Sequence, residues 1–138
     1  MTKETRIDHI GIATNSLDEN SWFWSELGFK QLTDEINIDQ GVKIRFFESE
    51  NTMNHPKIEL LEPIGSDSPI GRFIQKKGQG IQQLAISVEN IDEMILRLKD
   101  KGCKMINESP VEGVSGSRIA FVHPSSTGGV LVELVEKI

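Results

Sequence analysis

The sequence of 138 residues is poor in cysteine and in long apolar runs, and it has fewer basic than acidic residues. Cys103 is the only cysteine, which excludes an intrachain disulfide and a thiolate metal site and gives no sign of an oxidising compartment. No apolar run approaches the ~18 residues of a membrane span, so we expect no membrane association and a cytoplasmic location. Because 15 Lys and Arg stand against 21 Asp and Glu without a basic cluster, we expect no nucleic-acid partner.

What the sequence does contain is typical of one globular domain. Hydrophobic residues make up 37% and charged residues 26%, which excludes a long disordered tail. Single domains commonly have about 100 to 150 residues. We therefore expect residues 1–138 to form a single domain.

The chain carries an internal repeat with a spacing of 74 residues. The aligned segments are 7–12 with 81–86, Phe47 with Phe121, and 58–62 with 132–136, without a gap. One supersecondary unit is therefore written twice. We expect the first module at about residues 6–63, a linker with a short helix at 64–80, and the second module at about 81–136.

Each module has the pattern of a β-α-β-β-β unit. Alternating apolar residues predict an opening strand, and a helix follows, capped by Ser16 and ended by Gly28 in the first module and by Asn90 and Gly102 in the second. Three further strands are predicted in each module, at 29–32, 42–47 and 57–61 and at 104–106, 118–122 and 130–135. The fold class is therefore α+β, built from tandem βαβββ modules.

Four polar side chains occupy symmetric strand positions in the two modules: His9, Glu59, Gln83 and Glu133. Each glutamate is the polar member of an otherwise aliphatic strand, where a carboxylate is costly unless it is paired, protonated or bound to a cation. His9 precedes Glu59 by 50 residues, and Gln83 precedes Glu133 by the same number. Two modules related by a pseudo-twofold axis can bring all four side chains to one point.

An imidazole, an amide oxygen and two carboxylates suit a divalent ion of the Mn, Fe, Co, Ni, Zn or Mg type. A lone strand histidine more often has a structural or solvent-exposed role, and an isolated strand glutamate is usually solvated. The metal prediction therefore depends on the coincidence of the repeat with these four polar positions.

Trp22 and Trp24 lie two residues apart on the first predicted helix and so face different directions. We expect one of them in the core and the other in an interface. Arg118 and Lys43 occupy neighbouring repeat positions and either meet phosphate groups or are solvated. The glycine-bearing loop 107–117 is a candidate lid over a bound substrate.

Several motifs spread over nearly the whole chain resemble a known family. They are IDHIGIA at 7–13, QGVK at 40–43, IELLEP at 58–63, DSPI at 67–70, RIAFVHP at 118–124 and GGVLVEL at 128–134. With them the chain resembles the vicinal-oxygen-chelate (glyoxalase/bleomycin resistance) superfamily, and within it the methylmalonyl-CoA epimerases. The resemblance implies a glyoxalase-like half-barrel around a metal cleft, with the metal held by His9, Glu59, Gln83 and Glu133.

The resemblance further implies an isomerase that inverts the carbon between the thioester and the carboxylate of an acyl-CoA substrate, and a homodimer. Two departures matter. An amide, Gln83, replaces a histidine usual in the epimerases, and residues 43–46 lack a further glutamate that some epimerases carry. We therefore expect Glu59 and Glu133 to serve as the catalytic residues as well as metal ligands.

Three alternatives to this enzyme remain open. A glyoxalase I type lyase, similar to lactoylglutathione lyases, would use the same metal on a hemithioacetal. A related CoA-thioester epimerase would differ in its acyl pocket. A non-catalytic ligand-binding protein of the same superfamily would tolerate the change of histidine to Gln83.

Overall fold

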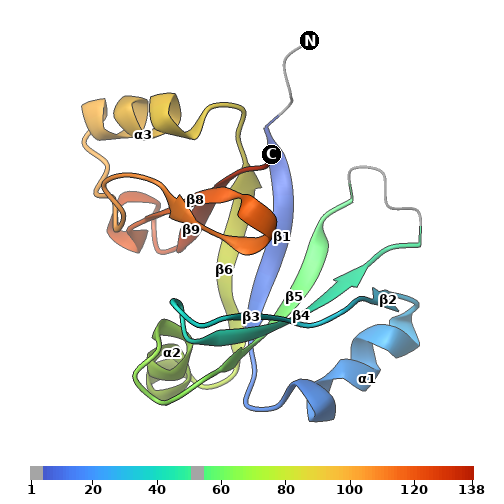
Figure 1. Ribbon diagram of the computed structural model, residues 1–138. Helices are drawn as coiled ribbons and strands as arrows, with labels where there is room; N and C mark the ends of the chain where they lie inside the picture. The colour runs from blue at the N-terminus through green and yellow to red at the C-terminus, as the bar shows by residue number, and fades with distance from the viewer. Residues whose placement is uncertain (1–4, 51–54) are drawn as a thin grey trace. The chain divides into compact units, whose positions relative to one another are not determined.

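The computed structural model describes residues 5–50 and 55–138 (Figure 1). Within these ranges the α-helices are α1 Leu17–Leu27, α2 Pro69–Lys77 and α3 Ile91–Asp100. The strands are β1 Arg6–Ala13, β2 Lys30–Gln31, β3 Glu35–Asn37, β4 Val42–Glu48, β5 Lys57–Pro63, β6 Gly80–Ser87, β7 Val111–Glu112, β8 Arg118–Val122 and β9 Val132–Glu136. None of the helices in the described ranges has the length and apolar character needed to cross a membrane.

The chain divides into two compact units close to the predicted module boundaries. One unit is His9–Gln82, and the other combines the chain up to Asp8 with Gln83–Ile138. The linker helix α2 belongs to the first of these units. The assignment of both units to one domain stays a prediction.

The first module is a mixed sheet with the strand order β2-β4-β5-β1, and β3 also pairs with β4. β1 runs parallel to β5, and β4 runs antiparallel to β5. Helix α1 contacts β4 and β5. Beneath the helix, the buried apolar cluster consists of Leu17, Phe47 and Leu60, with Trp24 packed at its margin.

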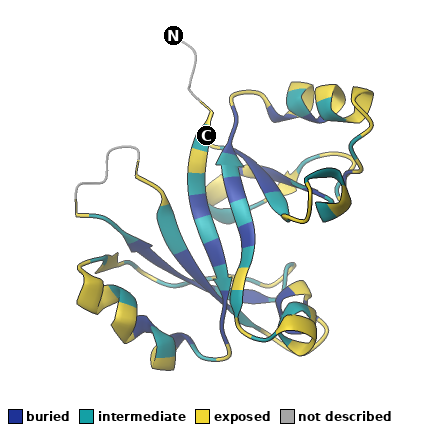
Figure 2. Ribbon diagram, turned by 180° about the vertical axis from the view of Figure 1, so that it is seen from behind, coloured by how far each residue is buried: buried dark blue, intermediate teal, exposed yellow. Residues whose placement is uncertain are grey.

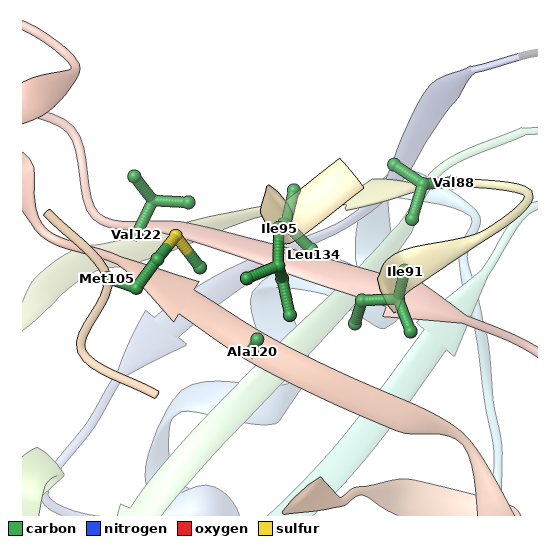
Figure 3. Close-up of a cluster of buried hydrophobic side chains, with 7 residues drawn as sticks. All are labelled: Val88, Ile91, Ile95, Met105, Ala120, Val122 and Leu134. Atoms are coloured by element: carbon green, nitrogen blue, oxygen red, sulfur yellow. The ribbon is translucent and has the colours of Figure 1, made fainter. Parts of the chain in front are cut away.

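The second module repeats this arrangement with the order β6-β9-β8-β7. β6 runs parallel to β9, β8 runs antiparallel to β9, and α3 contacts both β8 and β9. Its buried apolar cluster lies between α3 and the strands β8 and β9 (Figure 3). The buried members are Val88, Ile91, Ile95, Met105, Ala120, Val122 and Leu134. Both modules thus have the predicted mixture of one helix and a mixed sheet.

Hydrogen bonds at the helix starts confirm the repeat. Glu62 at the end of β5 accepts from the Leu17 amide at 2.9 Å, and Glu136 at the end of β9 accepts from the Ile91 amide at 2.9 Å. The predicted caps form at 3.1 Å in both helices, where Ser16 and Asn90 each accept an amide of the first turn. Because orphan amides at helix starts need such acceptors, the same solution occurs twice.

One predicted equivalence between the modules is wrong. Glu59 lies opposite Phe46, not Phe47, whereas Glu133 lies opposite Phe121. Phe46 is therefore the structural counterpart of Phe121, and the match continues only with compensating changes of length. The first module has one residue fewer before β4 than the second has before β8, and one residue more between β4 and β5.

Some predicted strand boundaries also differ from the structure. The segment 104–106 contributes a single bridge, from Met105 to Val122, and β9 begins at Val132 and not at residue 130. The predicted loop 107–117 contains the short strand β7 and a 3-10 turn at Val114–Gly116. Such two-residue edge pairings have no detectable alternation, because the period of a strand needs at least four residues.

Two of the resemblance motifs lie against each other in the first unit. Gly41 has φ +64°, and a Cβ there would lie 2.8 Å from the Cβ of Ser68. Ser68 begins α2 by accepting from the Gly71 amide at 3.1 Å, and the Ile64 amide donates to the Gly41 carbonyl at 2.8 Å. A side chain at position 41 would displace the start of α2, which explains why the two motifs occur together.

Candidate functional site

The strand pattern of the first module places His9 and Glu59 on one face of the sheet. Burial alternates along β1, with His9, Gly11 and Ala13 buried, and Figure 2 shows such alternating bands along the strands. Gly11 pairs with Glu59 across the parallel strands, so the side chain of Glu59 points to the same face. The intervening residues, such as Ile12, pack against α1. The two polar side chains therefore lie on the face opposite α1.

His9 and Glu59 form a buried pair. The distance from His9 Nδ1 to Glu59 Oε2 is 3.1 Å, and each residue is 6% exposed. Phe46 lies directly opposite Glu59 in β4 and is also buried. A carboxylate in such an apolar setting requires a polar or cationic partner, and the imidazole is one.

Gln83 and Glu133 form the corresponding pair in the second module. Gln83 Nε2 donates to Glu133 Oε1 at 3.0 Å, and the two residues are 8% and 6% exposed. Phe121 lies opposite Glu133 in β8. The repeat thus produces two buried pairs of the same design, and the meeting of all four side chains at one ion stays a prediction.

The chemistry of the four side chains fits a divalent cation. Carboxylate oxygens, an amide oxygen and an imidazole nitrogen are the donors that such ions bind, and in this chain all four side chains are buried. Asp8, a further carboxylate directly before His9 in β1, is not among the predicted ligands. Asp8 is paired with Lys137, and its only signal in the sequence is its place beside His9.

A second polar cluster lies on the helix side of the first module, around Arg45 in β4. Its Nε and Nη2 each donate to Asp34 at 2.8 Å, and its Nη1 donates to Asp18 at 3.0 Å and to Ser21 at 2.9 Å. The hydrogen bond from Arg45 lowers the pKa of Asp34, and the bonds to Asp34 and Asp18 raise the pKa of the guanidinium. This cluster joins α1, β4 and the segment before β3, and sequence analysis did not find it.

The basic side chains suggested for phosphate contact have carboxylate partners. Lys43 Nζ lies 4.0 Å from Asp34, and Arg118 pairs with Asp92 at 2.7 Å and with Glu136 at 3.6 Å. The hydrogen bond from Arg118 lowers the pKa of Asp92. Both side chains are partly exposed and lie at the ends of paired strands.

The fold agrees with a comparison against known protein families. Residues 8–121 match the family described as Glyoxalase/Bleomycin resistance protein/Dioxygenase superfamily. The chain belongs to this superfamily. The predicted recognition and the predicted α+β fold class are therefore confirmed.

Individual relatives and solved structures are similar to the chain over most of its length. The human mitochondrial methylmalonyl-CoA epimerase is 36% identical over 131 residues, which cover 94% of this chain and 72% of that protein. A solved methylmalonyl-CoA epimerase in complex with methylmalonyl-CoA and NH4+ is 36% identical, with a TM-score of 0.90 and coverage of 98% of this chain and 96% of the other. An uncharacterized protein of Bacillus subtilis, YqjC, is 39% identical over 132 residues, covering 95% of this chain and 91% of that protein.

Two of these relatives are methylmalonyl-CoA epimerases, and epimerases are isomerases. The prediction that this superfamily member is an enzyme of the isomerase class is thereby confirmed. The matched regions extend over both modules of the present chain.

Proposed function

We propose that this protein epimerises methylmalonyl-CoA or a similar acyl-CoA thioester. The reaction removes the proton from the carbon between the thioester carbonyl and the carboxylate, and returns a proton to the opposite face. The names and the bound substrate of the relatives support this substrate class. We propose a cytoplasmic homodimer as its working form.

The observation that carries the proposal is the pair of buried carboxylates at repeat-related positions, each with one polar partner. Inversion requires proton acceptors and donors on opposite faces of a planar intermediate. Glu59 and Glu133 are of one chemical type, are equally buried and belong to different modules, which supports a proton-transfer role for both. The absence of a further glutamate at 43–46 leaves these two as the bases we propose.

We propose that His9, Glu59, Gln83 and Glu133 hold a divalent metal ion. When bound, such an ion acts as a Lewis acid on the oxygen where negative charge develops, which lowers the energy of the enolate. The protein's own contribution is to hold the substrate and to move the proton at the carboxylate oxygens. The apolar residues opposite the carboxylates, Phe46 and Phe121, shield these oxygens from water.

Deuterium wash-in tests the proposed function. The purified protein should incorporate solvent deuterium at the α-carbon of methylmalonyl-CoA and lose this activity when a chelator removes the metal. Methylglyoxal with a thiol should not turn over, because that reaction defines the glyoxalase alternative. A protein that retains metal but leaves the α-proton of methylmalonyl-CoA in place would contradict the proposal.

Two substitutions test the proton-transfer roles. Glu59→Gln and Glu133→Gln keep the side-chain volume but remove the base, so each should lower the exchange rate by about 100- to 10,000-fold. Glu89→Gln, at an exposed position after β6, is the matched control and should leave the rate unchanged. Exchange at the wild-type rate in either of the first two variants would remove that residue from the mechanism.

A further inference from the structure

Lys57 lies next to His9 and Glu59 in the sheet of the first module. It is the first residue of β5 and pairs with His9 across the parallel strands. Paired residues of neighbouring strands point to the same face, and so do residues two apart in one strand. The side chains of Lys57, His9 and Glu59 therefore all leave the sheet on the face opposite α1. The lysine is half-buried there.

Within the described part of the chain, Lys57 has no counter-ion. Among residues 5–50 and 55–138, the ion pairs within 4.0 Å include other lysines, such as Lys43, Lys99 and Lys137, but not Lys57. A half-buried ammonium group without a carboxylate partner costs free energy unless it meets an anion or keeps its head in water. The second module has Leu131 at the repeat-related position, so an apolar residue is compatible with this place in the fold.

We propose that Lys57 binds the free carboxylate of a 2-carboxyacyl thioester and so makes the enzyme selective for this class over simple acyl thioesters. The inference rests on the proposed function. In such a substrate the carboxylate is bonded directly to the carbon that loses its proton, whereas the CoA phosphates lie far along the pantetheine arm. Lys57 lies two residues from Glu59 and beside His9, so its ammonium group suits the carboxylate near the reacting carbon better than the distant phosphates.

The difference between Lys57 and Leu131 explains what a lysine in one module would achieve. Both modules supply one glutamate, but the substrate has two different ends, a thioester and a carboxylate. At this repeat position the first module has a cation and the second has an apolar residue. The cation distinguishes the two ends of the substrate, because the carboxylate gains a charge-assisted hydrogen bond in one orientation. Binding in a single orientation keeps the α-proton aligned with the base.

Binding measurements with matched ligands test this role. Isothermal titration calorimetry compares methylmalonyl-CoA with propionyl-CoA, which lacks only the carboxylate, and with CoA alone. Lys57→Leu, which installs the residue of the second module, should weaken methylmalonyl-CoA binding by about 10- to 100-fold and leave the other two ligands unchanged. Lys57→Arg keeps the charge and should retain most of the preference for the carboxylate.

A control variant and two contrary results complete the test. Lys76→Leu removes one positive charge from the exposed end of α2 and should leave all three affinities unchanged. Equal weakening of all three ligands by Lys57→Leu would place the lysine at the CoA phosphates and overturn the inference, as would no weakening at all. Wild-type protein that prefers methylmalonyl-CoA over propionyl-CoA but exchanges no α-proton would contradict the proposed function and leave the role of Lys57 intact.

Discussion

The two modules solve the packing beneath their helices in different ways. Among residues 5–50 and 55–138, the buried apolar cluster at α3 in the second module has seven members, whereas the cluster at α1 in the first module has three. Two equivalent positions contribute to this difference. Ser21 of α1 corresponds to Ile95 of α3, and Arg45 of β4 corresponds to Ala120 of β8. A large apolar side chain beside a small one is thus replaced by a small polar side chain beside an arginine.

This difference shows that a duplicated βαβββ unit keeps its geometry when part of its core becomes ionic. The guanidinium of Arg45 reaches Ser21, the counterpart of Ile95, and its donors are satisfied by Asp34, Asp18 and Ser21. Ion pairs with a buried arginine give little net stability, but they require specific partners in specific places, and here Asp34 is the less exposed partner and Asp18 the more exposed one. The first module should therefore be sensitive to the loss of Arg45 or Asp34, and the second to the loss of volume.

Replacing a residue of one module by its counterpart from the other module should lower the free energy of unfolding most in the second module. Ile95→Ser should lower the free energy of unfolding by about 4 kcal/mol, because it removes a 3% exposed apolar side chain and buries a hydroxyl without an arginine beside it. Urea denaturation measures this value. Leu96→Ser, at the neighbouring exposed position, should change it by less than about 0.5 kcal/mol. Equal effects of the two substitutions would show that the second core is not closely packed.

The reverse exchange in the first module should cost somewhat less. Arg45→Ala should lower the free energy of unfolding by about 3 kcal/mol, because Asp34 keeps its charge without its partner while remaining 24% exposed in its side chain. Arg97→Ala on the exposed side of α3 serves as the control for loss of one arginine. If Arg45→Ala were neutral, the ionic cluster would have no part in holding α1 to the sheet.

The stability lost in Arg45→Ala should depend on pH. Arg45 lowers the folded-state pKa of Asp34 below its ordinary value of 3.8, so the pair contributes stability above that pH and loses it as the pH falls through the lowered pKa. The difference in unfolding free energy between wild type and Arg45→Ala should therefore be constant from pH 7 to about 5 and narrow below about 4. Urea denaturation at each pH measures it. A constant difference down to pH 2 would contradict the ionic origin.

The smallest effect is expected on the outer side of α1. Trp22 is 65% exposed, while Trp24 packs at the margin of the first core. Trp22→Ser should change the free energy of unfolding by less than about 0.5 kcal/mol, because little of its surface is buried on folding. Trp24→Ser is the matched substitution and should cost more. A large effect of Trp22→Ser would contradict this expectation and show that the tryptophan is buried in solution.

The sequence was sufficient to predict the elements that depend on local chemistry. The caps at Ser16 and Asn90 and the alternating strands that carry His9 and Glu59 follow from side-chain type and from period, and the structure has them. The pairing of Gln83 with Glu133 followed from the repeat. In each case the determining residues lie in one element or at one fixed spacing.

Features that depend on cross-strand register were not predictable in the same way. The counterpart of Phe121 was assigned to Phe47 because spacing alone cannot reveal an extra residue in a hairpin. The cluster around Arg45 joins segments that are 11 to 27 residues apart, and no period links them. Charged strand residues usually face water, so a buried arginine at position 45 gave no signal.

The one-residue shift between Phe46 and Phe121 has a consequence for the history of the chain. A residue gained in one hairpin and a residue lost upstream leave the overall distance between the halves at its original value. The constant spacing therefore conceals two separate length changes. Ancestral reconstruction of such fused duplicates should align residues by their strand partners, since counting along the chain would assign the wrong aromatic residue to the same ancestor.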